Sequence, residues 1–211
     1  MTICLQLDHV NYSYGAAKIR VLSDVNADFE SGKMYAITGP SGAGKSTLLS
    51  LLAGLDAPSD GVVRFEGEDI ATTGYSKRRR EHVSLVFQDH NLIDYLTPEE
   101  NLRLVNPKAD MKILEDLGLS REESKRNIMH LSGGQRQRVA VGRALVAPGR
   151  AILADEPTGS LDPEMTDEVI DLLRHAAHQL GKCVIVVTHS KRVADSADAV
   201  YTLRHKKLAK A

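Results

Sequence analysis

The sequence predicts an α/β fold in which helices cover both faces of a mainly parallel sheet. Short apolar runs that predict buried strands alternate with segments of helical periodicity. The strand-like runs are 34–38, 83–87, 151–154, 183–188 and 199–203, and the helical segments include 48–53, 136–145 and 164–179. The first run passes through a glycine-rich turn directly into a helix. Strands that alternate with helices are joined by right-handed crossovers, which gives a parallel sheet.

Length and composition suit one compact domain that works away from nucleic acid. The 211 residues are 42% hydrophobic and 26% charged, and the net charge of −1 gives no reason to expect nucleic acid or anionic lipid as a general partner. No apolar stretch approaches the ~20 residues of a membrane-spanning helix, and residues 1–6 lack a signal-peptide pattern. Cys4 and Cys183 follow no ligand pattern and are interpreted as buried hydrophobes in a reducing compartment. We therefore expect a cytoplasmic location, with any membrane role acting through a partner.

The glycine-rich turn predicts a phosphate-binding loop. Its glycines let the backbone curl so that successive N–H groups point at a phosphate, and the positive end of the next helix adds to that field. Lys45 can reach the β- and γ-phosphates, and Ser46 can offer its hydroxyl to Mg²⁺. A chance turn before a helix is the competing interpretation, but the intact Gly-Lys-Ser end favours a nucleoside triphosphate. The turn reads Gly39, Pro40, Ser41, Gly42, Ala43, Gly44, Lys45, Ser46, Thr47.

The first 70 residues predict antiparallel strands beside this sheet. Apolar residues recur at about every second position in 3–11 and 21–29, and 12–15 is interpreted as the turn or loop between these strands. Tyr14 is then placed to stack on a purine, and packing of its loop onto the sheet is an equal alternative. A turn-rich stretch at 54–61 precedes a short strand at 62–65. The basic run 76–81 predicts an exposed helix more than a nucleic-acid patch.

Residues 92–131 show no strand pattern and predict a small helical insert. Thr97 and Pro98 have the composition of a helix start, and 111–119 carries apolar residues at helical spacing. After the insert, Ser132, Gly133, Gly134 and Gln135 open an amphipathic helix. A Ser-Gly-Gly entry to a helix presents free N–H groups and is a second anion site. One phosphate chain hardly needs two such sites from the same molecule.

Polar residues follow three of the predicted core strands. Gln88 comes after 83–87, Asp155 and Glu156 come at the end of 151–154, and His189 comes after 183–188. The carboxyl ends of parallel strands are where such sheets place site residues. Paired carboxylates there suit a Mg²⁺ ligand and a water-activating base, with a helix N-cap as the weaker alternative. A lone histidine is usually structural, but this position favours the site.

Together these motifs resemble an ABC ATPase over essentially the whole chain. The phosphate loop, Gln88, 131–135, 152–156, 160–162 and His189 occur in the order and rough spacing of that family. The stretches 54–56, 86–88, 92–97 and 154–162 resemble one bacterial branch, which contains the lipoprotein-release, macrolide-export, antimicrobial-peptide-resistance and cell-division cassettes. The resemblance implies a single ABC-type P-loop NTPase domain over 1–211. It also implies an antiparallel β subdomain at about 1–30 and 61–70 and a helical subdomain at about 92–131.

The resemblance also implies how these residues bind ATP and Mg²⁺. Tyr14 would stack on adenine, and Gly39 to Thr47 would wrap the phosphates while Lys45 neutralises them. Ser46, Gln88 and Asp155 would hold Mg²⁺, Glu156 would be the general base, and His189 would contact the γ-phosphate. The γ-phosphate held by a second copy of the chain would be contacted by Ser132, Gly133 and Gly134, which form one stretch with Gln135. Asp162 would lie across the interface between the two copies. Two copies would then sandwich two ATP molecules as a homodimer.

Two departures from the family pattern concern the partner and the terminus. The interval from Gln88 to Ser132 is short for this branch, and 127–130 lacks the usual proline-bearing form. Because the helical insert normally docks the membrane partner, the identity of that partner stays open. The last turn is formed by residues 204–206, where the family usually has an Asp-Gly turn, and it lies in a basic stretch at 204–207. We expect this departure to affect only the terminal strand pair.

Two functions share the same predicted site. The first is an ATP-hydrolysing subunit at the inner face of the cell membrane that drives a separately encoded integral-membrane permease for export, lipoprotein extraction or peptide resistance. The second is an ATP-gated cell-division switch that moves no substrate. A nucleic-acid or ribosome machine would carry two cassettes or a long coiled coil, and a kinase would need an acceptor site. Neither pattern is evident in the sequence.

Overall fold

The apolar runs form the strands of one central sheet in the computed structural model, which describes residues 2–15, 18–76 and 81–211. The strand order is β10-β9-β3-β8-β7-β6. The pairs β3–β8, β3–β9, β6–β7 and β7–β8 are parallel, and only the pair β9–β10 is antiparallel among the described strands of this sheet. The strands are β3 (Met34–Thr38), β6 (Val83–Val86), β7 (Ala151–Asp155), β8 (Cys183–Val187), β9 (Ala199–Arg204) and β10 (Lys207–Lys210).

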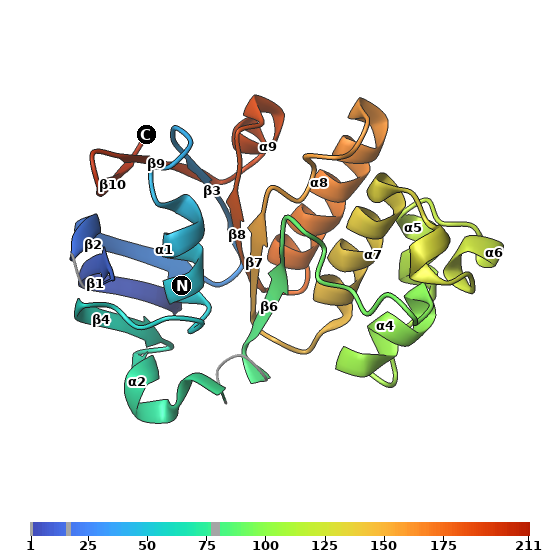
Figure 1. Ribbon diagram of the computed structural model, residues 1–211, viewed down its shortest axis with the longest axis horizontal. Helices are drawn as coiled ribbons and strands as arrows, with labels where there is room; N and C mark the ends of the chain where they lie inside the picture. Colours follow the sequence, from blue (N-terminus) through green and yellow to red (C-terminus); the bar gives the residue numbers. More distant parts are fainter. Residues whose placement is uncertain (1, 16–17, 77–80) are drawn as a thin grey trace.

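A second, antiparallel sheet comes from the first 70 residues. Its order is β2-β1-β4-β5, from β1 (Ile3–Tyr14), β2 (Ile19–Glu30), β4 (Asp60–Phe65) and β5 (Glu68–Asp69). This sheet and α1 lie on one side of the parallel sheet, and α7 and α8 lie on the other (Figure 1). The helices are α1 (Lys45–Leu52), α2 (Ile70–Thr73), α4 (Pro98–Val105), α5 (Lys112–Asp116), α6 (Arg121–Ser124), the 3₁₀ turn η1 (Ile128–His130), α7 (Gly133–Val146), α8 (Pro163–His178) and α9 (Lys191–Asp195).

Strand β8 shows why the central runs are apolar at every position. Alternate side chains of a strand point to opposite faces. Ile185 and Val187 pack into the core shared with α1 and the antiparallel sheet, whereas Val184 and Val186 pack into the core shared with α7 and α8. Cys183 and Cys4 are both buried, as expected from the sequence. A strand buried on both faces needs this continuous apolar run, and the predicted α/β class is confirmed.

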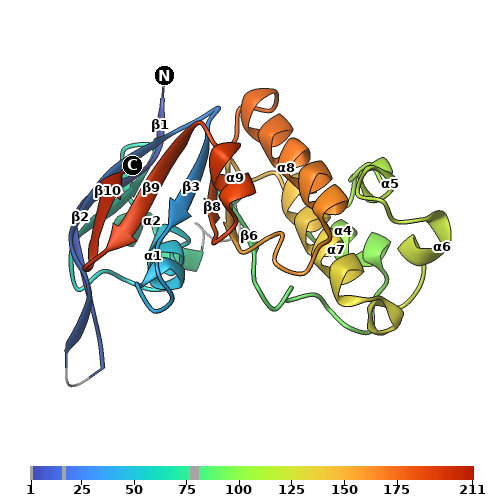
Figure 2. The same cartoon turned by 90° about the horizontal axis from the view of Figure 1, so that it is seen from above.

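The region 92–131 is helical and begins as predicted. Thr97 caps α4 by accepting a hydrogen bond from the Glu100 amide, and the Glu100 carboxylate accepts one from the Thr97 amide. Helices α5 and α6 lie beyond α7, at the end of the molecule away from the antiparallel sheet (Figure 2). No helix among the described residues combines the length and apolar character required to cross a bilayer.

One local prediction is corrected by the structure. Residues 12–14 are strand and not loop: β1 continues to Tyr14, which pairs with Ile19 of β2, and the Tyr12 side chain is buried. Tertiary contacts of both tyrosines override the turn-like composition of this stretch. The turn expected at 204–206 is present: it joins β9 to β10 in a hairpin, with His205 and Lys206 at φ 48° and 68°. The predicted helix at 76–81 falls largely on 77–80, which lie outside the described residues.

Candidate nucleotide site

The phosphate loop leaves the middle of the parallel sheet. Strand β3 lies between β8 and β9 and ends at Thr38, and α1 begins seven residues later at Lys45. Two glycines are required by the path of the loop. Gly39 has φ 150°, and a Cβ there would lie 2.4 Å from the Leu203 carbonyl oxygen. Gly44 has φ 101°, and a Cβ there would lie 2.7 Å from Val21 Cγ1. The backbone of β9 at Gly39, the side chain of Val21 at Gly44 and a positive φ at both positions therefore favour glycine there.

The first turn of α1 offers its N–H groups to a ligand. Its N-cap is Gly44, which provides no side-chain hydrogen bond, and the first turn carries no acidic residue. By contrast, α4, α6, α7, α8 and α9 are each capped by a Ser, Thr or Asp side chain. An uncapped helix start with a positive dipole end favours an anion. This difference supports the predicted phosphate position.

Lys45 lies folded over the loop. Its Nζ donates to the carbonyl oxygens of Gly39 at 2.9 Å and Pro40 at 3.1 Å, and the residue is only 7% exposed. The same atom lies 3.2 Å from His189 Nε2. The ammonium group is therefore held at the mouth of the loop, where a phosphate oxygen can replace the carbonyls.

Glu156 lies next to this pair. Its Oε1 is 3.7 Å from His189 Nε2, and its Oε2 accepts a hydrogen bond from Thr188 Oγ1 at 3.2 Å. Oε1 is buried and has no hydrogen-bond partner among the described residues. A buried carboxylate oxygen without a donor has room for one, such as a water molecule. Lys45, Glu156 and His189 thus converge from the ends of three adjacent strands, β3, β7 and β8.

The backbone of Glu156 is turned away from the strand. Its φ of 49° is left-handed, which costs a non-glycine residue about 1–2 kcal/mol. Its N–H donates to the Val187 carbonyl at 2.9 Å, and its own carbonyl accepts from the Gly159 amide at 3.1 Å. Neither Asp155 nor Glu156 caps α8, because Asp162 does so by accepting from the Met165 amide at 2.9 Å. The N-cap alternative for the two carboxylates is therefore wrong.

Tyr14 lies beside the loop, at the end of β1. Its hydroxyl is 3.2 Å from Thr47 Oγ1, and its ring meets Tyr12 edge-to-face with 4.8 Å between centroids. Tyr12 in turn donates a hydrogen bond to Asp56, and this bond raises the pKa of the Tyr12 phenol above its ordinary value. Half of the Tyr14 surface is exposed. The residue is thus anchored near the phosphate loop with its ring partly open to a ligand.

The predicted Mg²⁺ donors suit a hard cation. Ser46 and Gln88 are exposed, and Asp155 is half-buried at the end of β7. Hydroxyl, amide and carboxylate oxygens are the donors that Mg²⁺ takes, together with phosphate oxygens. No group of three His, Cys, Asp or Glu side chains among the described residues could hold a metal by itself. The donor set therefore fits an ion that arrives with the nucleotide.

The predicted second anion site lies apart from the first. The Ser132 side chain caps α7 by accepting from the Gln135 amide, and the Gln135 Oε1 accepts from the Ser132 amide at 2.8 Å. Gln135 Nε2 also donates to Glu123 Oε1 at 2.5 Å. A Cβ on Gly133 would meet open space. In the part of the chain that the structure describes, no hydrogen bond or ion pair joins 132–135 to 39–47.

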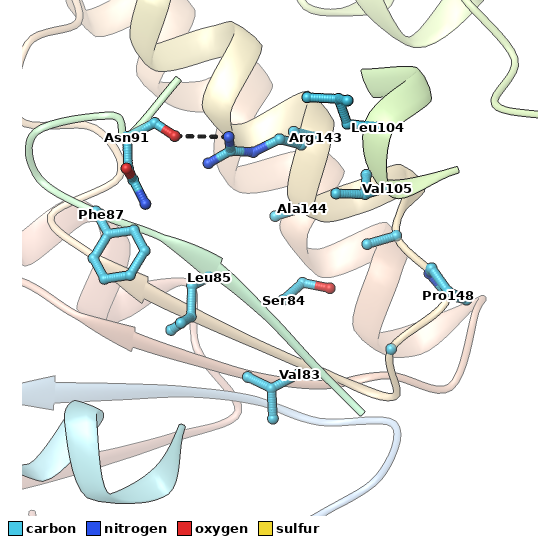
Figure 3. A pocket seen from close by; sticks show the side chains of 12 residues that line it. Val83, Ser84, Leu85, Phe87, Asn91, Leu104, Val105, Arg143, Ala144 and Pro148 are labelled. Carbon is cyan, nitrogen blue, oxygen red and sulfur yellow. Dashed lines mark hydrogen bonds between the residues drawn. The ribbon is translucent and has the colours of Figure 1, made fainter. Parts of the chain in front are cut away.

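Two residues near the site were not found from the sequence. Thr188 holds the Glu156 carboxylate, and its position just before His189 at a strand end was the signal that could have identified it. Arg143 binds the segment that follows Gln88, and nothing in its helical pattern distinguishes it from other polar positions. Side chains from β6, α4 and α7 also surround a hollow of about 470 Å³ close to this segment (Figure 3).

Comparison with known proteins identifies the family. The model of the ABC transporter family matches residues 22–159, more than half of the chain. The uncharacterized ABC transporter ATP-binding protein YclH of Bacillus subtilis is 37% identical over 204 residues, which cover 92% of this chain and 90% of that protein. The macrolide export ATP-binding/permease protein MacB of Escherichia coli is 38% identical over 97% of this chain, which spans 34% of that longer protein.

Solved structures agree with the sequence relatives. The dimeric structure of MJ0796, a bacterial ABC transporter cassette, matches with a TM-score of 0.90 and 33% identity over 98% of both chains. A post-hydrolysis state of the same cassette, bound to ADP and Pi, matches with a TM-score of 0.85. The predicted ABC-type fold and the resemblance to the branch with macrolide exporters are confirmed. The chain belongs to the ABC transporter family and is an ATP-hydrolysing subunit of that type.

Proposed function

We propose that this chain powers a separate membrane permease by closing, as a homodimer, around two ATP molecules. The observation that carries the proposal is the division of the site. One half of the site consists of the uncapped start of α1 with Lys45, Glu156 and His189. The other half is the start of α7, which makes no hydrogen bond or ion pair with the phosphate loop within the described residues. A second copy in head-to-tail arrangement supplies the missing half. Dimeric structures of the similar cassette MJ0796 support this arrangement.

Each residue of the first half has a proposed role. Lys45 exchanges the Gly39 and Pro40 carbonyls for phosphate oxygens, and Tyr14 stacks on adenine. Glu156 takes a proton from the attacking water, for which its buried Oε1 is the free acceptor. His189 contacts the γ-phosphate. Ser46, Gln88 and Asp155 hold Mg²⁺, which when bound neutralises charge that develops on the phosphates.

The second half binds from across the interface. Ser132, Gly133 and Gly134 direct the N–H groups of the first turn of α7 to the γ-phosphate of the partner, and Gln135 keeps Ser132 in place through the capping box. Asp162 at the start of α8 lies at the same interface. ATP therefore joins the two subunits, and its hydrolysis releases them.

The hollow beside β6 is the proposed dock for the permease. Apolar residues of β6, α4 and α7 line it together with a few polar ones, and Phe87 next to Gln88 lines it as well (Figure 3). Leu104 and Val105 of α4 line it too and stay 57% and 38% exposed. Exposed apolar side chains around a concavity are typical of protein interfaces. A segment seated there would contact the neighbour of Gln88, which links the partner to the nucleotide.

The finer function follows the relatives. The similarity to the macrolide export ATP-binding/permease protein MacB favours an export-type system. This assignment places the subunit at the inner face of the cell membrane. The alternative, an ATP-gated cell-division switch, uses the same site and partner surface.

Mixing two inactive variants tests the shared site. A heterodimer of Lys45→Ala and Ser132→Arg subunits contains one intact site, built from the loop of the second chain and the α7 start of the first. We expect the mixture to hydrolyse ATP faster than either variant alone. The matched control mixes Lys45→Ala with a Lys45→Ala, Ser132→Arg double variant, which leaves no intact site. If heterodimers are present but neither mixture hydrolyses ATP, the result would contradict the shared-site proposal.

A matched pair of variants tests the permease dock. Leu104 and Leu180 are equally exposed, at 57%, but only Leu104 lines the hollow beside β6. Leu104→Glu should reduce the fraction of the protein recovered with membranes that contain the permease, and Leu180→Glu should not. Equal recovery of both variants with such membranes would place the dock elsewhere.

A further inference from the structure

The segment that follows Gln88 borders two hollows on the protein surface. Asn91 lines both the hollow beside β6 and a second one of about 330 Å³, which is lined by Asp89, His90, Asn91, Leu92, Asp94 and Arg136. His90 and Asn91 both have left-handed backbones, with φ of 62° and 48°. Packing alone therefore supplies little support to this stretch, and specific polar contacts must hold its path.

Arg143 of α7 supplies those contacts. Its Nη1 donates to the Asn91 carbonyl oxygen at 2.7 Å (Figure 3). Its Nη2 donates to the His90 carbonyl oxygen at 3.3 Å. Burial lowers the pKa of this guanidinium, and no ion pair to a carboxylate is recorded for it within the described residues. A planar fork with several donors in fixed geometry holds two successive carbonyls in a way that a single ammonium cannot.

The same helix begins at the second anion site. Arg136 lies two turns before Arg143 and so on the same face of α7. His90 and Arg136 line the same hollow, so the segment runs beside the start of α7. It is held to this helix by the two hydrogen bonds of Arg143.

We propose that Arg143 is a positioning residue that fixes Gln88 relative to the anion-binding start of α7. The inference rests on the proposed role of Gln88 at the Mg²⁺ site. The fork of Arg143 ties the backbone of His90 and Asn91 to α7. Because Gln88 lies two residues before His90, these two hydrogen bonds fix where Gln88 lies relative to the start of the helix.

Lys182 provides a matched control for burial of a cation. Its Nζ donates to the carbonyls of Ala147 at 2.6 Å and Leu145 at 3.4 Å, at the other end of α7, and burial lowers its pKa as well. Loss of this contact should affect the stability of the fold without affecting Gln88. Comparing variants of Lys182 and Arg143 therefore distinguishes a buried cation that only stabilises the fold from one that also positions a residue of the nucleotide site.

The test is a double-mutant cycle on ATP hydrolysis by the full chain. Arg143→Lys keeps the charge but removes the fork, and it should lower kcat roughly tenfold to a hundredfold, the scale of a small misplacement, with little change in KM for ATP. In a Gln88→Ala background, Arg143→Lys should cause no further loss, because its effect passes through Gln88. Lys182→Gln should lower the melting temperature and leave kcat unchanged.

Each other outcome identifies what fails. Additive losses in the cycle would overturn the positioning role of Arg143 while leaving Gln88 as a site residue. A wild-type kcat for Gln88→Ala would overturn the proposed role of Gln88 and, with it, this inference. A fall in melting temperature and a rise in KM for Arg143→Lys, matched by Lys182→Gln, would make Arg143 a structural residue only.

Discussion

Lys45 Nζ and His189 Nε2 lie 3.2 Å apart across the mouth of the phosphate loop. An ammonium can only donate hydrogen bonds, so the histidine nitrogen accepts, and the imidazole proton belongs on Nδ1. The same Nε2 is 3.7 Å from Glu156 Oε1. An ammonium, an imidazole and a carboxylate thus meet at the point where a terminal phosphate is expected. Each can exchange its present contact for one with the nucleotide.

Lys45→Ala should abolish ATP binding or hydrolysis while the domain stays folded. The side chain gives up two hydrogen bonds to loop carbonyls, a cost of about 1–3 kcal/mol in total, whereas the nucleotide loses its main countercharge. Binding of a fluorescent ATP analogue, phosphate release and thermal unfolding measure the three quantities. Lys191→Ala, at a mostly exposed lysine paired with Asp195, is the control. If Lys45→Ala hydrolyses ATP at the wild-type rate, the assignment of residues 39–47 as the phosphate-binding loop is wrong.

Two alanine substitutions in the loop should differ in their effect. At Gly42 a Cβ meets nothing within 4 Å, so Gly42→Ala costs only the strain of a positive φ, roughly 1 kcal/mol. At Gly39 a Cβ would lie 2.4 Å from the Leu203 carbonyl, so β3 or β9 must shift as well. We expect Gly39→Ala to lower the melting temperature more and to weaken ATP binding more. Equal losses would show that the contact with β9 does not constrain the loop.

Acid should weaken the fold partly through Asp198. Burial acts to raise the pKa of this carboxyl, but hydrogen bonds from the Met34 amide and His178 outweigh it, so the pKa lies below its ordinary 3.8. A depressed folded-state pKa stabilises the fold above the unfolded value, and this contribution is lost as pH falls through the folded pKa. Urea unfolding between pH 6 and roughly pH 3 should therefore show a smaller acid loss for Asp198→Asn.

The matched control for Asp198 is Asp195→Asn. Asp195 forms only an exposed ion pair with Lys191, at 2.6 Å, and such pairs contribute little to stability. Its variant should follow the wild-type pH profile. An unchanged acid loss in Asp198→Asn would mean that the link between β3, α8 and Asp198 does not stabilise the fold.

The parallel sheet was predictable because its strands are buried on both faces. Residues 183–187 alternate between two cores, so they must all be apolar and their pattern is unambiguous. The end of β1 was not predictable in the same way. Tyr12 and Tyr14 have a turn-like neighbourhood, and their strand state depends on Asp56 and Thr47, more than thirty residues away. Such contacts leave no local signal in the sequence.

The members of the site were predictable, but their contacts were not. The glycine-rich turn indicated Lys45, and Glu156 and His189 were indicated because each directly follows the end of a core strand. The hydrogen bond from Thr188 to Glu156 spans 32 positions, and that from Arg143 to Asn91 spans 52. These contacts follow from strand order and helix packing, which only the folded chain defines.

Glu156→Gln should stop hydrolysis and trap a dimer. The amide keeps the size of the carboxylate, and its oxygen can still accept from Thr188 Oγ1, so the left-handed turn at this residue should persist. What is lost is the carboxylate that deprotonates water, a contribution on the order of 10²–10⁴ in rate. The variant also removes one negative charge beside the phosphates. ATP therefore remains intact and should hold two subunits together.

Gel filtration with and without nucleotide tests this trap. With ATP, Glu156→Gln should shift from monomer to dimer, because the unhydrolysed γ-phosphate is bound by Lys45 and His189 of one subunit and by the α7 start of the other. The shift should fade with ADP, which lacks that phosphate, and should vanish when Ser132→Arg is added. Wild-type hydrolysis by Glu156→Gln would show that another group is the base. An inactive variant that stays monomeric with ATP would mean that closure requires the permease, and the mechanism would then belong to the complex instead of the isolated subunit.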